Sequence, residues 1–308
     1  MKKALSILTA GCLAVSLAAC GSTAASSAAS AADSTASSAA ESTAASDTAA
    51  ADGQTYKVGI CQLVQHVALD AATQGFKDAL TEQLGDAVTF EEKNAQGDSN
   101  TCSTIINGFV SDNVDLILAN ATPALQAAQA ATNTIPVLGT SVTEYGVALG
   151  IDDFDGLVGT NISGTSDLAP LDEQAGIIKE LFPDAKTVGL LYCSAEPNSQ
   201  YQVDTVKASL EELGYTCEYY AFSDSNDLAT VCQSAADASD VIYVPTDNTV
   251  ANNTEIVNNI CQPAGVPVVA GEEGIMSGCG VATLSISYYD LGVATGKMAV
   301  KILTGEAN

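Results

Sequence analysis

The chain has 308 residues, of which 37 are acidic and 10 basic, and its formal net charge is −27. All the basic residues are lysines, so no arginine is available to bind a phosphate, sulfate or dicarboxylate in a bidentate way. This charge also excludes nucleic acid as a partner, because neutralising phosphates requires a basic face. His66 is the only histidine and no two cysteines have CxxC spacing, which argues against a zinc site.

The first 20 residues are typical of a bacterial export signal. Lys2 and Lys3 precede an apolar run over residues 4–19, which is too short for a spanning helix of about 20 apolar residues. The run ends in Leu-Ala-Ala-Cys, which resembles a lipoprotein signal in which Cys20 receives a lipid. We therefore expect residues 1–19 to be a signal peptide and Cys20 to anchor the chain on the extracytoplasmic face of the cell membrane. The alternative is an ordinary signal peptide with a coincidental cysteine.

Residues 20–55 consist almost entirely of serine, alanine and threonine with a few acids. Such a segment cannot bury a core, and we expect a disordered linker between the lipid and a globular body. A flexible coil of this length would span roughly 30–35 Å.

From residue 56 onward, short apolar runs alternate with amphipathic stretches. Such runs are typical of strands buried on both faces, and they occur at residues 57–64, 87–92, 114–120, 135–142, 187–194, 216–222, 240–246, 266–271 and 281–287. The helical stretches between them include residues 69–84, 123–134, 171–181, 200–213 and 249–261. Repeated strand–helix–strand units predict an α/β fold with parallel sheets covered by helices on both faces.

A glycine-rich, helix-poor stretch at residues 146–166 interrupts this rhythm. We therefore predict two doubly wound, Rossmann-like lobes joined by a hinge. The first would contain residues 56–160 and 285–308, and the second residues 161–284. A ligand would bind between the lobes, at the carboxyl ends of the strands.

Polar side chains follow most of the predicted strands. The candidates for ligand contact at these strand ends are Gln62, His66, Thr122, Ser141, Thr143, Asn198, Ser199, Asp247 and Glu272. Each also suits an N-cap or a packing role, His66 included, and that interpretation stays open for any one of them.

Sequence motifs in this order resemble a known family. They include VGICQ at residues 58–62, EPNS at 196–199, VPTDN at 244–248 and GEEG at 271–274. The resemblance covers nearly all of residues 56–306 and is to the substrate-binding proteins of bacterial ABC importers, within the type I periplasmic-binding fold. More narrowly, the chain is similar to those described as tryptophan/tyrosine transport proteins. Members usually continue past the position of Glu306, so a closing strand or hinge crossing is expected beyond it.

The resemblance implies a monomeric binding protein that is not an enzyme and that works with a membrane permease. Its ligand would be an amino acid with an aromatic or apolar side chain. We expect Asp247 to pair with the ligand ammonium, with Glu272 as second choice. Neutral donors near helix N-termini, Ser141 and Asn198 foremost, would hold the carboxylate. The ligand side chain would lie against an aromatic wall made by Tyr145, Tyr192 or Tyr289.

Other functions stay open from sequence alone: a sensor module, a binding protein for a sugar or nucleoside, a surface enzyme or an adhesin. The chain has no G-x-S-x-G, P-loop or G-x-G-x-x-G motif, and we expect no cofactor and no metal. Besides Cys12 and Cys20 it has seven cysteines, an odd number, and we expect most to be small buried apolar residues.

Overall fold

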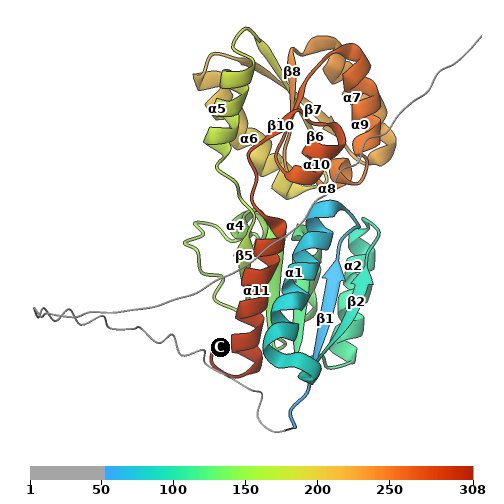
Figure 1. Ribbon diagram of the computed structural model, residues 1–308, viewed down its shortest axis with the longest axis vertical. Coiled ribbons are helices and arrows are strands. Elements are labelled where there is room, and N and C mark those ends of the chain that lie inside the picture. The colour runs from blue at the N-terminus through green and yellow to red at the C-terminus, as the bar shows by residue number, and fades with distance from the viewer. Residues whose placement is uncertain (1–52, 308) are drawn as a thin grey trace, which may run out of the picture. The chain divides into compact units, whose positions relative to one another are not determined.

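The computed structural model describes residues 53–307, which form two parallel sheets of five strands each (Figure 1). The expected signal peptide, Cys20 and most of the expected linker lie outside these residues. Two separate parallel sheets with alternating helices confirm the predicted fold class.

The first lobe has the strand order β2-β1-β3-β4-β5, with every pairing parallel. Its strands are β1 (Tyr56–Gln62), β2 (Val88–Asn94), β3 (Leu116–Asn120), β4 (Val137–Val142) and β5 (Ile162–Ser166). Its helices are α1 (Val67–Leu84), η1 (Gly85–Ala87), α2 (Ser99–Ser111), α3 (Thr122–Ala131), α4 (Tyr145–Leu149) and α11 (Tyr288–Leu303).

The second lobe repeats this topology, with the order β10-β9-β8-β6-β7. Its strands are β6 (Thr187–Cys193), β7 (Thr216–Phe222), β8 (Val241–Val244), β9 (Val268–Ala270) and β10 (Ala282–Thr283). Its helices are α5 (Leu171–Leu181), α6 (Pro197–Glu212), α7 (Ser225–Ala238), α8 (Asn248–Ala251), α9 (Thr254–Ala264) and α10 (Glu273–Cys279). In both lobes the first strand lies between the second and the third, which makes the carboxyl ends of the first and third strands a topological switch point.

Successive strand residues divide between the two faces of the first sheet. Val58 and Ile60 pack with α1 and α11, whereas Cys61 and Ile117 pack with α2 and α3. Because both faces are covered, the strands read as nearly continuous apolar runs. The second sheet is covered in the same way, by α5 and α6 on one face and by α7 and α9 on the other.

The last helix, α11, lies directly against α1 in the first lobe (Figure 1). Two glycines permit this close approach. A Cβ on Gly75 would collide with the carbonyl oxygen of Tyr289, and one on Gly292 would collide with the carbonyl oxygen of Ala72. Because neither residue has a side chain, the backbones of α1 and α11 come into direct contact. Through this contact α11 packs on the first lobe, although it follows the second lobe in the chain.

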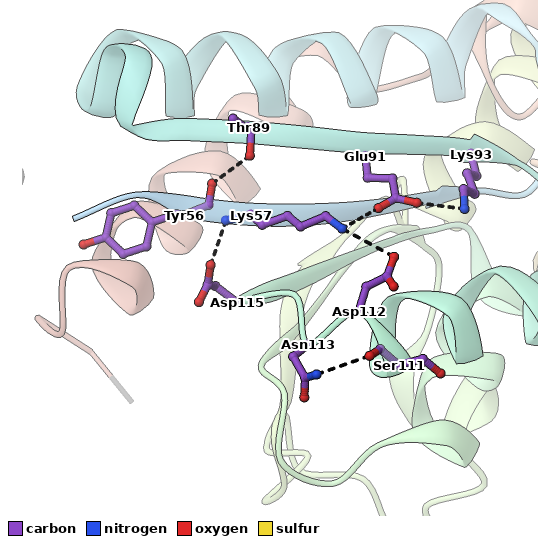
Figure 2. Close-up of polar contacts among 9 residues, drawn as sticks. All are labelled: Tyr56, Lys57, Thr89, Glu91, Lys93, Ser111, Asp112, Asn113 and Asp115. Carbon is purple, nitrogen blue, oxygen red and sulfur yellow. Dashed lines mark hydrogen bonds and ion pairs between the residues drawn. The ribbon is translucent and has the colours of Figure 1, made fainter. Parts of the chain in front are cut away.

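Polar contacts hold the first strand, β1, near its amino end (Figure 2). Lys57 Nζ lies 2.8 Å from Glu91 of β2 and 3.4 Å from Asp112, and the Lys57 backbone N–H donates to Asp115. The ion pairs are solvent-exposed and contribute little each. They nevertheless connect β1 to its neighbour β2 and to the loop before β3, in agreement with the observed register.

The structure corrects the expected boundary between the lobes. Strand β5 pairs with β4, so the first lobe extends through Ser166, and the expected division between residues 160 and 161 is wrong. The chain crosses at residues 167–170 and returns at 284–287. The strand escaped prediction because only Ile162 of its five residues is buried. Gly164, at φ +152°, faces the hydroxyl of Tyr145 where no side chain would fit.

Two helices of more than ten residues, α2 and α7, were also missed. The sequences of α2 and α7 contain many Asn, Ser, Thr and Asp residues, which have low intrinsic helix propensity. Both helices begin at an aspartate N-cap, Asp98 and Asp224 respectively, and pack their few apolar residues on the sheets. Within residues 53–307, no helix combines the length and the apolarity that crossing a membrane requires.

Candidate ligand-binding site

A small cavity lies where the carboxyl ends of the two sheets meet. The first lobe contributes His66, Leu69, Ser141, Thr143, Asp167 and Tyr288. The second lobe contributes Asn198, Thr246, Asp247, Asn248, Ala251 and Glu272. Most of these residues follow a strand directly or begin a helix, because parallel strands bring their carboxyl ends to one edge.

Hydrogen bonds join the lobes around this cavity. His66 Nε2 lies 3.2 Å from Asn248 Oδ1, and Thr143 Oγ1 lies 3.5 Å from Thr246 Oγ1. The amide of Gln202 donates across to Thr143 Oγ1 at 3.5 Å and, within its own lobe, to Thr246 Oγ1 at 2.6 Å. The cavity volume in this arrangement is about 10 Å³, which is room for about one water molecule. A larger ligand therefore enters only when the lobes separate or side chains rearrange.

Asp247 is the N-cap of α8 and is only 1% exposed. Its Oδ2 accepts the backbone N–H of Cys193 at 2.7 Å, and its Oδ1 accepts that of Val250 at 2.9 Å. Burial, reinforced by the nearby Glu196 carboxylate, raises the pKa of Asp247 to about 8. The carboxyl group therefore lies in a site that penalises its negative charge.

Glu196, the N-cap of α6, is buried with its carboxylate against the first residues of α8. Its two carboxylate oxygens accept the backbone N–H groups of Asn248 and Thr249, at 3.0 and 2.9 Å. It also accepts from the Asn248 side-chain amide at 2.7 Å. This bond fixes the orientation of Asn248, because the amide nitrogen points to Glu196 and Oδ1 points to His66.

Asp167 follows β5 and is 4% exposed. The hydroxyl of Tyr288 donates to its Oδ2 at 2.8 Å, whereas its Oδ1 is buried without a partner. Burial raises the pKa of Asp167, and burial likewise raises that of Glu272, the N-cap of α10. None of the lysines among residues 53–307 lines the cavity. Three carboxyl groups thus share one enclosed space without a lysine beside them.

Four unpartnered polar atoms belong to residues that line this cavity. Among residues 53–307, seven buried side-chain nitrogen or oxygen atoms lack a hydrogen-bond partner, and four of them belong to cavity residues: His66 Nδ1, Ser141 Oγ, Asp167 Oδ1 and Asn198 Oδ1. Buried polar groups are almost always hydrogen-bonded in folded proteins. Their concentration in one place therefore marks a site that is completed by another molecule.

The chemistry of these four atoms is mostly that of acceptors. Because Asn248 presents an oxygen to His66 Nε2, that nitrogen carries the hydrogen. Burial lowers the pKa of His66, which favours a neutral ring whose Nδ1 is an acceptor. Asp167 Oδ1 and Asn198 Oδ1 are also acceptors, and only the hydroxyl of Ser141 can donate.

Ser141 has a left-handed backbone, with φ +54°, at an irregularity in the pairing of β4 with β5. Ala121, at the end of the neighbouring strand β3, also has a positive φ of +91°. Both are conformations that non-glycine residues rarely adopt. The backbone is thus strained at two adjacent strand ends of the first lobe, one of which presents an unpartnered hydroxyl to the cavity.

Six of the eleven expected side chains line the cavity: His66, Ser141, Thr143, Asn198, Asp247 and Glu272. Three other expected residues are buried but are not part of the cavity lining: Gln62, Thr122 and Ser199. Gln62 is engaged in bonds to Asp70 and Thr73. The Ser199 side chain lowers the pKa of Asp247, against the larger opposite effect of burial.

None of the three tyrosines expected beside the ligand, Tyr145, Tyr192 and Tyr289, is part of the cavity lining. Tyr192 packs in the core between the second sheet and α6 and bonds to Gln200 at 2.9 Å. Tyr289 is 43% exposed and donates to Asp78 of α1 at 3.0 Å. Tyr288, its neighbour at the start of α11, faces the cavity instead. Tyr145 is buried and donates to the carbonyl of Thr165, on the inner side of the edge strand.

Sequence reasoning also missed Asp167. The signal that could have found it is its place as an acid directly after a strand, but that strand was not recognised. Within residues 53–307 no group of three or more His, Cys, Asp or Glu side chains is arranged to hold a metal ion.

Comparisons with known proteins agree with this architecture. Residues 57–308 match the family model of ABC transporter substrate binding proteins. A tyrosine-binding protein of Clostridioides difficile is 37% identical over 253 residues, which cover 81% of this chain and 73% of that protein. The crystal structure of an ABC domain from Streptococcus pneumoniae in complex with L-Trp is 35% identical, with a TM-score of 0.79 over 82% of this chain and 86% of that one.

A third relative bears on the arrangement of the lobes. The ligand-free, open structure of a substrate binding protein with adhesive properties from Clostridium difficile is 40% identical over 82% of this chain and 86% of that one, with a TM-score of 0.60. Although its sequence is more similar than that of the L-Trp complex, its structure is less so. The lobes of this chain are thus arranged more like those of the ligand-bound relative, in agreement with the hydrogen bonds between them.

These matches confirm the resemblance found in the sequence. Proteins of this kind bind solutes on the extracytoplasmic side of the membrane and are not enzymes. The family model covers the whole two-lobed body, and the cavity lies between the lobes. This chain belongs to the family of ABC transporter substrate-binding proteins.

Proposed function

We propose that this chain captures a free amino acid with an aromatic side chain and delivers it to an ABC importer. The observation that carries the proposal is the set of four unpartnered buried atoms in the interlobe cavity. Three of them are acceptors, and a primary ammonium group has three N–H donors. The surrounding carboxyl groups and the lack of a lysine favour a cationic group at the same place.

We assign Asp167 as the first partner of the ligand ammonium. Its Oδ1 is free, whereas both oxygens of Asp247 already accept backbone N–H groups. Asp247, the residue expected from sequence, lies in the same cavity and stands second. Asn198 also belongs to the ammonium side in this assignment, because its amide nitrogen donates to the Thr246 carbonyl at 3.1 Å and its free atom is an acceptor.

The ligand carboxylate is assigned to Ser141. Its hydroxyl is the one unpartnered donor in the cavity. A charge-assisted hydrogen bond from a buried hydroxyl is shorter and stronger than a neutral one. His66 Nδ1, an acceptor in the neutral ring, belongs with Asp167 and Asn198 on the ammonium side.

The ligand side chain would contact Leu69, Ala251 and Tyr288, the apolar and aromatic part of the lining. Two relatives support an aromatic amino acid, since one is a tyrosine-binding protein and the other was crystallised with L-Trp. Such a side chain is larger than the present cavity, so binding requires an open state that closes over the ligand.

The cellular setting completes the proposal. A lipid on Cys20 would hold the protein at the outer face of the membrane, and residues 20–55 would serve as its tether. The protein would act as a monomer, and the closed lobes would present the ligand to a membrane permease. The support is the Leu-Ala-Ala-Cys motif together with the family.

Calorimetry on the purified protein tests the ligand class. The panel contains L-Tyr and L-Trp, tyramine, which lacks the carboxylate, and 3-(4-hydroxyphenyl)propanoate, which lacks the ammonium. We expect each truncated analogue to bind at least about 30-fold more weakly than L-Tyr, because it leaves a buried polar group unpaired. Equal binding of tyramine and L-Tyr would refute the carboxylate assignment. Tighter binding of an uncharged sugar such as myo-inositol would refute the proposal as a whole.

A further inference from the structure

Two thiols meet in the core of the second lobe, away from the ligand cavity. Cys232 of α7 and Cys261 of α9 place their Sγ atoms 3.7 Å apart, with exposures of 0% and 2%. They belong to the apolar cluster that α7 and α9 form with the second sheet, and Cys279 of α10 packs against the same cluster. Seven cysteines are free among residues 53–307, and six of them are buried.

The geometry of the pair is close to that of a cystine. A disulfide bond is about 2.05 Å long, so the two sulfur atoms need to approach by only about 1.7 Å. The thiols lie on neighbouring packed helices. A change of side-chain rotamer with a small shift of one helix would supply this distance.

A route from solvent reaches one member of the pair. Cys261 and Cys279 both line a cavity of about 250 Å³ beside α9 and α10. Cys261 lines a second, wider cavity of about 710 Å³ with residues 181–185. Cys261, at 2% exposure, is therefore the member of the pair that borders these cavities, and Cys232, at 0% exposure, is reached only through it.

The extracytoplasmic compartment allows oxidation of the two thiols. Substrate-binding proteins of this family act outside the cytoplasm, where thiols are not kept reduced by the cytosolic pool. We propose that Cys232 and Cys261 form a disulfide site that a small-molecule disulfide oxidises. The thiolate of Cys261 attacks one sulfur of the oxidant, forms a mixed disulfide and releases one thiol. The thiolate of Cys232 then attacks Cys261 Sγ and displaces the second thiol.

The reaction balances without another reagent. Two protein thiols lose two electrons and two protons and form one S–S bond, and the oxidant's S–S bond is reduced to two thiols. The new bond would join α7 to α9 and close a loop across a sequence separation of 29 residues. Such a loop constrains the unfolded chain and stabilises the lobe.

Peptide mapping tests the site directly. The fully reduced protein is treated with oxidised glutathione, its remaining thiols are blocked, and it is digested with a protease that cleaves after glutamate. The four cysteines of the second lobe beyond α6 then fall on separate peptides, namely residues 213–218, 219–255, 256–272 and 274–306. We expect peptide 219–255 to be linked to peptide 256–272, with the melting temperature of the intact protein raised by roughly 5 °C.

Cys232→Ala should abolish the link and the rise in melting temperature. Cys217→Ala, at another buried cysteine of the same lobe, should keep both and is the matched control. A link between peptides 256–272 and 274–306, glutathione on Cys279 alone, or no oxidation of the wild-type protein would each overturn the proposal. The map of the wild-type protein decides the matter even if Cys232→Ala fails to fold.

Discussion

The hydroxyl of Tyr288 donates a 2.8 Å hydrogen bond to Asp167 Oδ2 and thereby ties together the two segments by which the chain passes between its lobes. Asp167 opens the first crossing, directly after β5, and Tyr288 follows the second crossing at the start of α11. The other oxygen of the same carboxylate faces the cavity without a partner. A ligand cation on that oxygen would therefore be coupled to the hinge through a single side chain.

The first prediction concerns that oxygen. Asp167→Asn removes the negative charge but keeps the shape, and we expect it to weaken amino acid binding at least about 30-fold, since unpairing a desolvated charge typically costs 2–5 kcal/mol. Asp152→Asn, on an exposed loop of the same lobe, should bind as the wild type does. Calorimetric titration with L-Tyr measures both variants. Wild-type affinity in Asp167→Asn would move the ammonium partner to another acid, and Asp247→Asn is the next variant to titrate.

The second prediction uses two adjacent tyrosines as a matched pair. Tyr288→Phe loses the hydroxyl that supports Asp167, whereas Tyr289→Phe loses one that bonds to Asp78 at the surface. We expect the first to weaken binding roughly 10- to 150-fold, since a hydrogen bond to a charged group contributes about 1.5–3 kcal/mol, and the second to leave binding unchanged. The reverse order of effects in the same titration would contradict the site described above.

Much of the fold follows from pattern alone. The strands at residues 57–64, 114–120 and 187–194 are apolar almost throughout, and only a sheet covered on both sides buries such runs. The edge strand β5 lacks this signal because only Ile162 is buried, and its omission displaced the lobe boundary.

The site was predictable to a smaller degree, for a physical reason. Strand ends identify which residues reach the cleft, and this found His66, Ser141 and Asp247. The sequence does not determine which side chain of a helix's first turn faces a neighbouring cavity. Tyr289 was therefore predicted as a ligand contact, whereas Tyr288 lines the cavity. Which atoms stay unpartnered depends on every neighbour at once, and the assignment of Asp167 needed the three-dimensional structure.

The third prediction tests the membrane anchor, which lies outside the described residues. Cys20→Ala removes the only site for the proposed lipid, and we expect the variant to appear in the culture medium or to accumulate with its signal peptide uncleaved. Immunoblots of membrane and medium fractions measure this. Cys12→Ala, within the same signal, is the control and should fractionate as the parent does. Retention of processed Cys20→Ala in the membrane would refute lipid attachment.

The last prediction concerns the stability of the ligand-free protein between pH 5 and pH 8. Burial raises the pKa of Asp247 to about 8, so the folded protein holds a proton there that the unfolded chain has already released above its ordinary value of 3.8. Stability must then fall as pH rises, by at most about 1.4 kcal/mol per pH unit for such a group. Asp167 and Glu272, whose pKa values are also raised by burial, act in the same direction.

His66 acts in the opposite direction, because burial lowers its pKa and the unfolded chain binds its proton more readily. The difference in slope between the wild type and Asp247→Asn removes this contribution, since both proteins contain His66. Urea unfolding at pH 5, 6, 7 and 8 gives the two slopes. We expect the free energy of unfolding of the wild type to decrease more steeply with pH than that of Asp247→Asn. Parallel curves would mean that Asp247 is already ionised in the folded protein at pH 5, and that the acids around the cavity are stabilised as anions before any ligand cation arrives.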